Sequence, residues 1–222
     1  SESALIQLTD MNGFSAVPAV SPDGKQITFH NCNNGQCDIY VMNSDGTNLK
    51  NLTGGTDDKR WPRWKPDGKW IAYLSDKSGE DEIYMQAADG LTPAKQLTKN
   101  ADTYKYSITW SPDNNKIAWC DQKKRLNIIE VNTQAVTVVA TSKTSEINDF
   151  AWSSNGKWIA YSDRMPAHMD QIFLYEIATQ KATVITTQSY SSYSPAFSSD
   201  GKYLLFVSDR DFNPIYSSTE WN

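Results

Sequence analysis

The stretch Ser21-Pro22-Asp23-Gly24-Lys25, followed by alternating apolar residues, decides the fold because it recurs along the chain. Its other copies are Lys65-Pro66-Asp67-Gly68-Lys69, Ser111-Pro112-Asp113-Asn114-Asn115, Ser153-Ser154-Asn155-Gly156-Lys157 and Ser198-Ser199-Asp200-Gly201-Lys202. The position of Gly24 therefore recurs every 42 to 46 residues, which is the period of one β-propeller blade. We predict an all-β propeller with five blades in this chain.

The residues around this turn repeat as well. The third and fifth residues after the Gly24 position are apolar, and the fifth is always aromatic. Alternate residues of a strand lie on the same face, so both positions share one face, which must be buried. The aromatic members are Phe29, Tyr73, Trp119, Tyr161 and Phe206.

Each repeat has room for four short strands. After the second strand come a turn, a third strand such as residues 82–85, another turn, and a fourth strand such as residues 94–98. Four antiparallel strands joined by tight turns are typical of an antiparallel propeller blade. We predict one domain over residues 1–222, and a parent ring of six or seven blades stays open. The blades are expected at about 16–53, 60–98, 106–140, 148–186 and 193–222.

The two ends of the chain allow two interpretations. Residues 5–9 resemble the fourth strand at 94–98, so we expect them to form an extra outer strand. The fifth repeat has a third strand expected at 215–217 but no fourth strand before Asn222. Either the N-terminal strand completes the last blade and removes a sheet edge, or the chain is a slice of a longer protein. The missing initiator Met favours the slice.

The recurring Asp-Gly pair has a structural role in these turns. The Asp side chain can accept a hydrogen bond from the backbone two residues on, and Gly adopts a positive φ without strain. Asn114 and Asn155 are the next-best residues for such turns, which fits the copies where the pattern drifts. We therefore assign these carboxylates to the fold and not to a metal site or to catalysis.

Composition excludes several classes of function. The net charge of −5 and the pI near 5.0 argue against a nucleic-acid partner, which needs a dense basic face. No apolar run approaches the roughly 20 residues of a membrane span. Two distant histidines, His30 and His168, and no Gly-x-Ser-x-Gly elbow predict no catalytic residue, metal or cofactor.

The three cysteines give a weak signal for the compartment. Cys32 and Cys37 flank a short turn, so they are either a disulfide or two free thiols. A bond would indicate the periplasm or beyond, because disulfides persist in oxidising compartments. We expect a periplasmic protein, with the cytoplasm as the alternative, and an inert packed thiol at Cys120.

The repeats resemble a known family of propellers. The Asp-Gly-Lys turns, the Ile-Tyr third strands and endings such as Gln96-Leu97-Thr98 are similar to TolB-type propeller repeats. Residues 193–203 (YSPAFSSDGKY) and above all 208–222 (SDRDFNPIYSSTEWN) resemble the first, N-terminal propeller of tricorn-type serine peptidases. This resemblance implies a parent that cleaves oligopeptides, with its nucleophile and base in downstream domains outside this chain.

The resemblance also implies two functions for the chain itself. One is a noncatalytic part of a tricorn-like peptidase that guides peptide substrate or product and supports assembly. The alternative is a TolB-like periplasmic propeller that binds other proteins and has no enzymatic activity. Both imply peptide or protein partners, and a homo-oligomer stays open.

The loops that lead from a fourth strand to the next first strand open near the central channel of a propeller. Tyr in such loops offers contact area and a hydroxyl at little entropic cost. Our candidates for peptide binding are Arg60, Tyr104, Tyr106, Glu146, Tyr190 and Tyr193. The alternative is that each is an ordinary solvated loop residue.

The acidic loop residues suggest a third class of function. Carboxylates from several loops could act as the acid and the nucleophile of a glycosidase. Asp57, Asp102, Glu146 and Asp149 come from three loops, so they could converge. Most propellers of this composition would offer as much, so we favour the peptide-binding interpretation.

Overall fold

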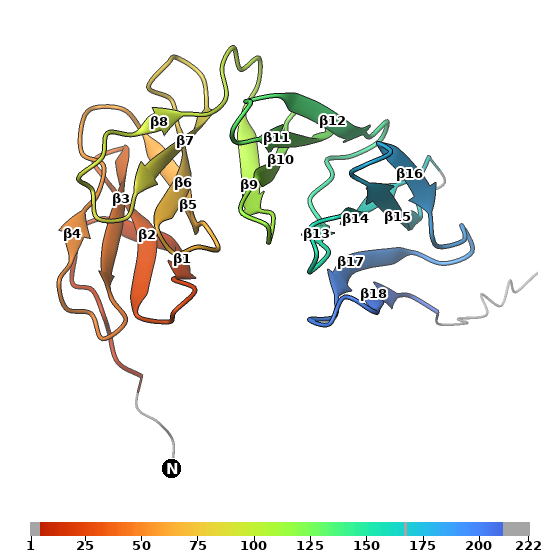
Figure 1. The fold of residues 1–222 in the computed structure, drawn as a ribbon, viewed down its shortest axis with the longest axis horizontal. Coiled ribbons are helices and arrows are strands. Elements are labelled where there is room, and N and C mark those ends of the chain that lie inside the picture. The colour runs from red at the N-terminus through yellow and green to blue at the C-terminus, as the bar shows by residue number, and fades with distance from the viewer. Residues whose placement is uncertain (1–4, 167, 211–222) are drawn as a thin grey trace, which may run out of the picture.

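The computed structural model describes residues 5–166 and 168–210, and every regular element in these residues is a strand. Figure 1 shows five sheets side by side in an arc, with the first strand of each sheet on the inner side. The sheets are named blades 1 to 5 in chain order. The all-β propeller fold predicted from the repeats is therefore confirmed.

The strands of each blade follow one another in the sheet. Blade 1 holds β1 (Phe14–Val20), β2 (Gln26–Asn33), β3 (Gln36–Asn43) and β4 (Lys50–Asn51). Blade 2 holds β5 (Lys59–Trp64), β6 (Trp70–Ser75), β7 (Glu82–Ala87) and β8 (Lys95–Gln96). Blade 3 holds β9 (Lys105–Trp110), β10 (Lys116–Asp121), β11 (Arg125–Glu130) and β12 (Val136–Thr141). Blade 4 holds β13 (Phe150–Trp152), β14 (Trp158–Arg164), β15 (Asp170–Glu176) and β16 (Lys181–Val184). The described part of blade 5 holds β17 (Ser192–Phe197) and β18 (Leu204–Ser208).

The recurring turn joins the first two strands of each blade, as its sequence predicts. The backbone N–H of Lys25 donates to Asp23 Oδ1 at 3.1 Å, and Gly24 has a φ of +73°. Ser21 adds a contact that the pattern did not suggest, because its hydroxyl donates to Asp23 and accepts from the N–H of Gln26. The Asp or Asn therefore closes the turn, and in the copies that begin with Ser this residue ties the turn to the strand that follows.

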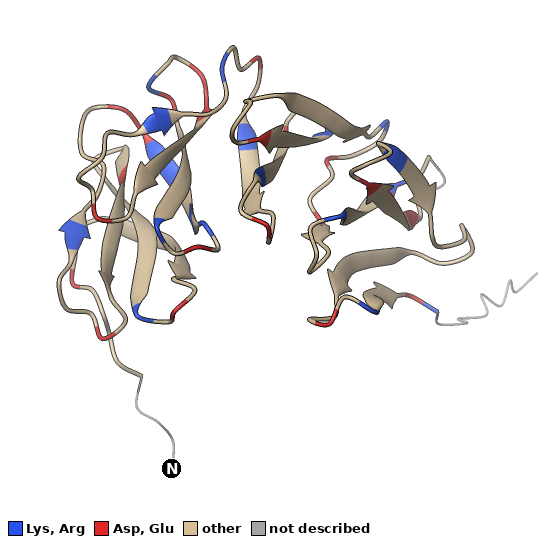
Figure 2. Cartoon of the chain, viewed as in Figure 1, with Lys and Arg blue, Asp and Glu red and all other residues tan. Residues whose placement is uncertain are grey.

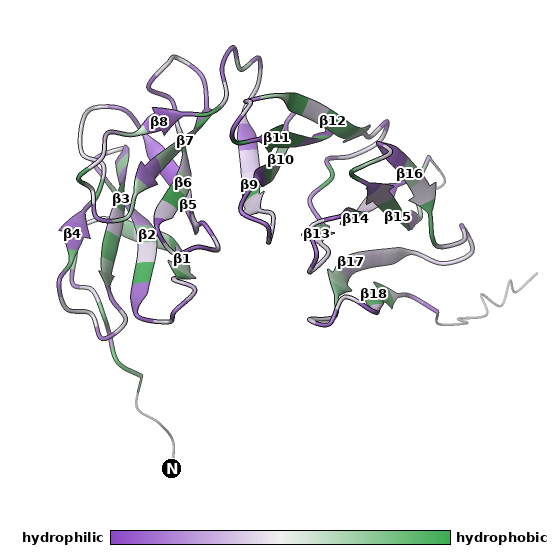
Figure 3. Ribbon diagram, in the orientation of Figure 1, coloured by the Kyte–Doolittle hydropathy of each residue, from purple (hydrophilic) through white to green (hydrophobic). Residues whose placement is uncertain are grey.

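The core lies in the seams between neighbouring blades. Between blades 2 and 3, Leu74 and Ile83 pack in one cluster with Ile108, Trp110 and Trp119. Four of the five aromatic residues predicted to share the buried face are less than 5% exposed, and Phe206 is half-buried. Figure 3 shows hydrophobic segments in middle strands such as β10 and β11, whereas the outer strands β4 and β8 are hydrophilic.

At each of two seams, a Trp indole donates a hydrogen bond to a backbone carbonyl of the preceding blade. Trp64 Nε1–H donates to the carbonyl of Ala19 in blade 1 at 3.0 Å, and Trp110 Nε1–H donates to Arg63 in blade 2 at 3.2 Å. Trp152 occupies the same position in blade 4, but within the described residues its buried Nε1 has no partner. The seam between blades 3 and 4 therefore lacks a contact that the two earlier seams have.

The end segments differ from the sequence expectation. Residues 5–9 form no strand, and Leu5 and Ile6 are exposed. The backbone of Leu8 lies near Gly46 in the turn between β3 and β4, so this segment follows blade 1 without pairing as a strand. The strand expected at 215–217 and most of segment 208–222 lie outside the described residues.

Candidate functional site

The candidate binding residues lie at one end of the blades. The loops before β5, β9, β13 and β17 reach this end together with the hairpins that join the second and third strands. Figure 2 shows positions of both charge signs dispersed over these segments. The end is therefore polar and mixed in charge, and we call it the loop end.

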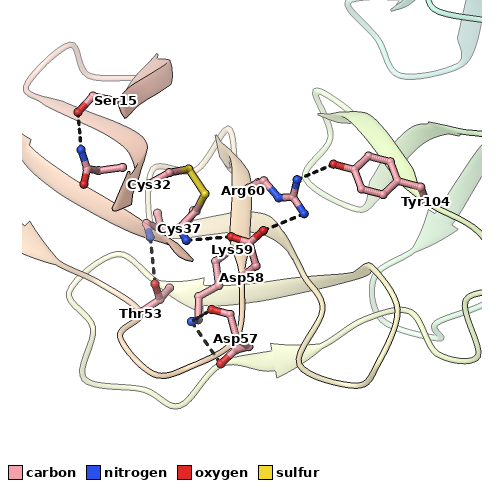
Figure 4. The surroundings of a disulfide bond; sticks show 11 residues. Ser15, Cys32, Cys37, Thr53, Asp57, Asp58, Lys59, Arg60 and Tyr104 are labelled. Carbon is pink, nitrogen blue, oxygen red and sulfur yellow. Dashed lines mark hydrogen bonds and ion pairs between the residues drawn. A yellow bond between two sulfur atoms is a disulfide. The ribbon is translucent and has the colours of Figure 1, made fainter. Parts of the chain in front are cut away.

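Arg60 and Tyr104 form a direct contact between blades 2 and 3 (Figure 4). Arg60 Nη1–H donates to the Tyr104 hydroxyl at 2.8 Å, and the guanidinium lies 5.4 Å from the centre of the Tyr104 ring. Asp58 holds the other Arg60 amino group at 2.8 Å. The Arg60 side chain is still 31% exposed. Because a guanidinium has five N–H donors, Arg60 keeps donors for a ligand.

Two buried polar side chains flank this pair. His30 and Asp81 are each 6% exposed, and within the described residues His30 Nδ1 and Asp81 Oδ2 have no hydrogen-bond partner. Burial lowers the pKa of His30, with the charge of Arg60 adding to the effect, and burial raises the pKa of Asp81. His30 is therefore neutral at pH 7. Sequence reasoning missed Asp81, which could have been found by its place directly before a third strand.

Tyr106 interacts with Asp121 of its own blade and with Glu146 in the loop that leads to blade 4. Its hydroxyl donates to the carbonyl of Asp121 at 3.0 Å. Burial and the nearby Glu146 carboxylate raise the pKa of Tyr106. The hydroxyl of Tyr106 is therefore occupied, and its ring belongs to the wall between blades 3 and 4.

Glu146 and Tyr193 line one open pocket of about 430 Å³ between blades 4 and 5. Tyr193 also donates to Asp209 Oδ1 at 3.2 Å. The other residues of the pocket are Ser145, Asn148, Asp149, Ser162, Arg164 and Asp170. Tyr190 lines a separate pocket, where Arg210 lies 5.9 Å from the centre of its ring.

The structure thus divides the six candidates into distinct places. It brings Arg60 together with Tyr104, and Glu146 together with Tyr193. Tyr106 is packed beside Glu146, and Tyr190 stands apart.

Two lysines of the loop end are unavailable to a ligand. Lys59 Nζ lies 3.1 Å from Asp38 and 3.2 Å from Asp57, and Lys105 Nζ lies 3.2 Å from Glu82. The side chains of Lys59 and Lys105 are 5% and 7% exposed, so these ion pairs are buried between blades. Sequence reasoning missed the Lys59–Asp38 and Lys105–Glu82 pairs because each joins residues of two different repeats.

The acidic residues considered for a glycosidase do not form one site. Asp57 accepts from the Ser75 hydroxyl and pairs with Lys59. Hydrogen bonds from Lys123 and Arg125 lower the pKa of Asp102 to about 2. Both carboxylates are therefore held in local contacts, away from the pocket that Glu146 and Asp149 share.

Over residues 5–166 and 168–210, no group of three His, Cys, Asp or Glu side chains is placed to bind a metal ion. The same residues contain no helix with the length and hydropathy that a membrane span requires.

Cys32 and Cys37 are joined by a disulfide (Figure 4). They lie opposite each other on the hairpin of β2 and β3, whose turn is Asn34-Gly35. The backbone N–H of Cys37 donates to Asp58 Oδ1 at 2.9 Å. Cys120 is a fully buried free thiol, and burial raises its pKa.

Comparison with known proteins identifies relatives of this chain. The family described as the tricorn protease second beta propeller domain matches residues 16–222. The tricorn protease homolog 1 of Streptomyces coelicolor is 29% identical over 106 residues, which are 48% of this chain and 10% of that protein. The matched part is thus about a tenth of that relative's length.

Solved structures share the fold. The putative TolB of Agrobacterium tumefaciens has a TM-score of 0.66 at 22% identity, covering 91% of this chain and 72% of that one. The crystal structure of the tricorn protease has a TM-score of 0.61 at 16% identity, covering 97% of this chain and 30% of that one. The tricorn and TolB resemblance is confirmed, although the matching family describes the second propeller and the resemblance pointed to the first.

Proposed function

The chain belongs to the family of the tricorn protease second β-propeller domain, and we propose that it is a noncatalytic, peptide-binding propeller of a tricorn-like serine peptidase. In this proposal the loop end receives peptide substrate or product, and domains outside this chain perform the cleavage and assemble with it. The Cys32–Cys37 disulfide favours a periplasmic location, because such bonds persist in oxidising compartments.

The contact of Arg60 with Tyr104 is the observation that carries the proposal. A guanidinium with unused donors can bind a peptide carbonyl or carboxylate, and an aromatic ring beside it offers an apolar surface for a side chain. Glu146 and Tyr193 add a polar pocket at the same end. An extended peptide that follows the loop end could contact both places.

A TolB-like interaction propeller is the second candidate. The likeness in fold to the TolB structure supports this candidate as much as it supports the tricorn interpretation, because both kinds of protein contain such blades. The gene downstream of Asn222 distinguishes the two. A peptidase domain in the same reading frame favours the tricorn-like parent, and a stop codon favours the TolB-like protein.

Peptide binding can be measured directly. The probe is a fluorescein-labelled pool of random octapeptides, and the readout is fluorescence anisotropy with the oxidised protein. We expect Arg60→Met and Tyr193→Ala each to weaken binding, because each removes a contact at the loop end. Matched controls are Lys157→Met and Tyr203→Ala, which change the turns at the opposite end of the blades. Equal binding by all four variants would contradict the proposal.

A further inference from the structure

The Arg60–Tyr104 pair is connected to the disulfide through one side chain. Asp58 accepts from the N–H of Cys37 with Oδ1 at 2.9 Å and binds Arg60 Nη2 with Oδ2 at 2.8 Å. Arg60 Nη1–H then donates to Tyr104 at 2.8 Å. Figure 4 shows this continuous path from the blade 1 hairpin through the blade 2 loop to blade 3.

The backbone of Asp58 is fixed as well. Its N–H donates to Asp76 Oδ1 at 2.7 Å, and its carbonyl accepts from the N–H of Asp76 at 3.2 Å. The carboxylate is therefore the part of Asp58 that links the hairpin to Arg60. One of its oxygens accepts from the Cys37 N–H and the other binds Arg60 Nη2, which fixes the orientation of the guanidinium.

We infer that Asp58 is a positioning residue for peptide binding by Arg60 and Tyr104, and that the Cys32–Cys37 disulfide controls it. The inference rests on the proposed function, because it assigns regulation to the same contact. In the oxidised protein the hairpin end holds the Cys37 N–H on Asp58. In the reduced protein two thiols need more room than one disulfide, because nonbonded sulfur atoms cannot approach as closely as bonded ones. The hairpin end then opens, and Asp58 and Arg60 lose their fixed orientation.

The reduction has a defined course. Cys37 is 6% exposed and Cys32 is half-buried, so the thiolate of a small dithiol attacks Cys32 Sγ. The S–S bond breaks and Cys37 leaves as a thiolate, which takes up a proton. The second thiol of the reagent then attacks the mixed disulfide and releases Cys32. Two electrons pass to the protein, and the reagent leaves as its own disulfide.

The test compares oxidised and reduced protein. Binding of the octapeptide pool is measured before and after treatment with the dithiol, with complete reduction verified by a thiol count. We expect the affinity of the reduced protein to be at least about threefold lower, as for a mutation along a coupled contact path. The variant with both Cys32→Ser and Cys37→Ser should bind like the reduced protein and ignore the reagent. Asp58→Asn should bind weakly in both states.

A second readout does not need the peptide. The NMR signal of the Arg60 guanidinium Nε–H, assigned with Arg60→Lys, should shift and broaden when the protein is reduced. In Asp58→Asn the signal should not respond to reduction, whereas a merely structural role of Asp58 would leave it responsive. An unchanged Arg60 signal in fully reduced wild-type protein would overturn the inference. If the oxidised protein fails to bind the pool, the proposed function fails, and the Arg60 signal still decides whether the disulfide controls this pair.

Discussion

The ammonium group of Lys105 in blade 3 lies 3.2 Å from the carboxylate of Glu82 in blade 2, and both side chains are almost fully buried. Glu82 also accepts a hydrogen bond from the Thr98 hydroxyl at 2.5 Å, and Thr98 in turn accepts from the N–H of Ile83. Lys59 and Asp38 form the equivalent ion pair one seam earlier. Buried charges thus join blades 1, 2 and 3 at the loop end.

Removing the charge of Glu82 should destabilise the propeller. Glu82→Gln leaves the ammonium of Lys105 buried without its ion-pair partner, which costs about 3 kcal/mol in the free energy of unfolding. Urea denaturation followed by circular dichroism measures this loss. The control is Asp200→Asn, whose ion pair with Lys202 is exposed to solvent, so the loss of stability should be much smaller. Equal losses for the two variants would refute a buried role for the Glu82 pair.

The indole hydrogen bonds can be tested by comparing two similar substitutions. Trp64→Phe and Trp152→Phe both remove an indole, but only Trp64 donates to a backbone carbonyl, that of Ala19. We expect Trp64→Phe to lose about 1 kcal/mol more than Trp152→Phe, because it leaves that carbonyl unpaired. Thermal or urea unfolding of both variants measures the difference. A larger loss for Trp152→Phe would contradict this account of the seams.

Asp81→Asn should stabilise the protein at pH 7. Burial raises the pKa of Asp81, so this group contributes stability below its ordinary pKa, and the contribution is lost as the pH rises through its folded-state pKa. At pH 7 the charged carboxylate of Asp81 is buried with its Oδ2 unpaired. The neutral amide of Asn removes this desolvation cost, which is about 1 kcal/mol in the free energy of unfolding. Urea unfolding at pH 7 and pH 4 should show the gain shrink at the lower pH. A loss of stability at pH 7 would contradict the prediction.

His30 should make the protein sensitive to mild acid. Burial lowers its folded-state pKa, so its contribution is fully present above the ordinary pKa of 6.5 and is lost as the pH falls through the lower folded value. Stability should therefore decrease from pH 7.5 to pH 5, and His30→Gln should flatten this decrease. His168→Gln is the control, because His168 is exposed. An identical pH profile for wild type and His30→Gln would show that His30 does not titrate in this way.

The blades were predictable from sequence because their signals are local. Each Asp-Gly turn hydrogen-bonds within a few residues, and each strand alternates by its own pattern, so a single repeat contains the information. Residues 5–9 show the limit of this reasoning. Their pattern is that of a strand, but a strand also needs a free sheet edge, and the pattern cannot show whether one lies within reach.

The candidate site was predictable only in part. Arg60 and Tyr104 could be named from their loops, but their contact depends on how blade 2 stacks on blade 3, which no single repeat encodes. The same holds for the Lys105–Glu82 pair and for Asp58, whose partners come from blades 1 and 2. The disulfide stayed open because two cysteines across a turn bond only when the hairpin places them opposite each other.

The most direct test of the account follows binding and cleavage of the same peptides in one sample. The oxidised protein is incubated with the labelled octapeptide pool, anisotropy gives the bound fraction, and mass spectrometry follows the peptides over several hours. The proposed function predicts saturable binding and no hydrolysis, because it assigns peptide binding to the loop end and cleavage to domains outside this chain. Hydrolysis that a serine-directed inhibitor blocks, or no binding at all, would contradict the account.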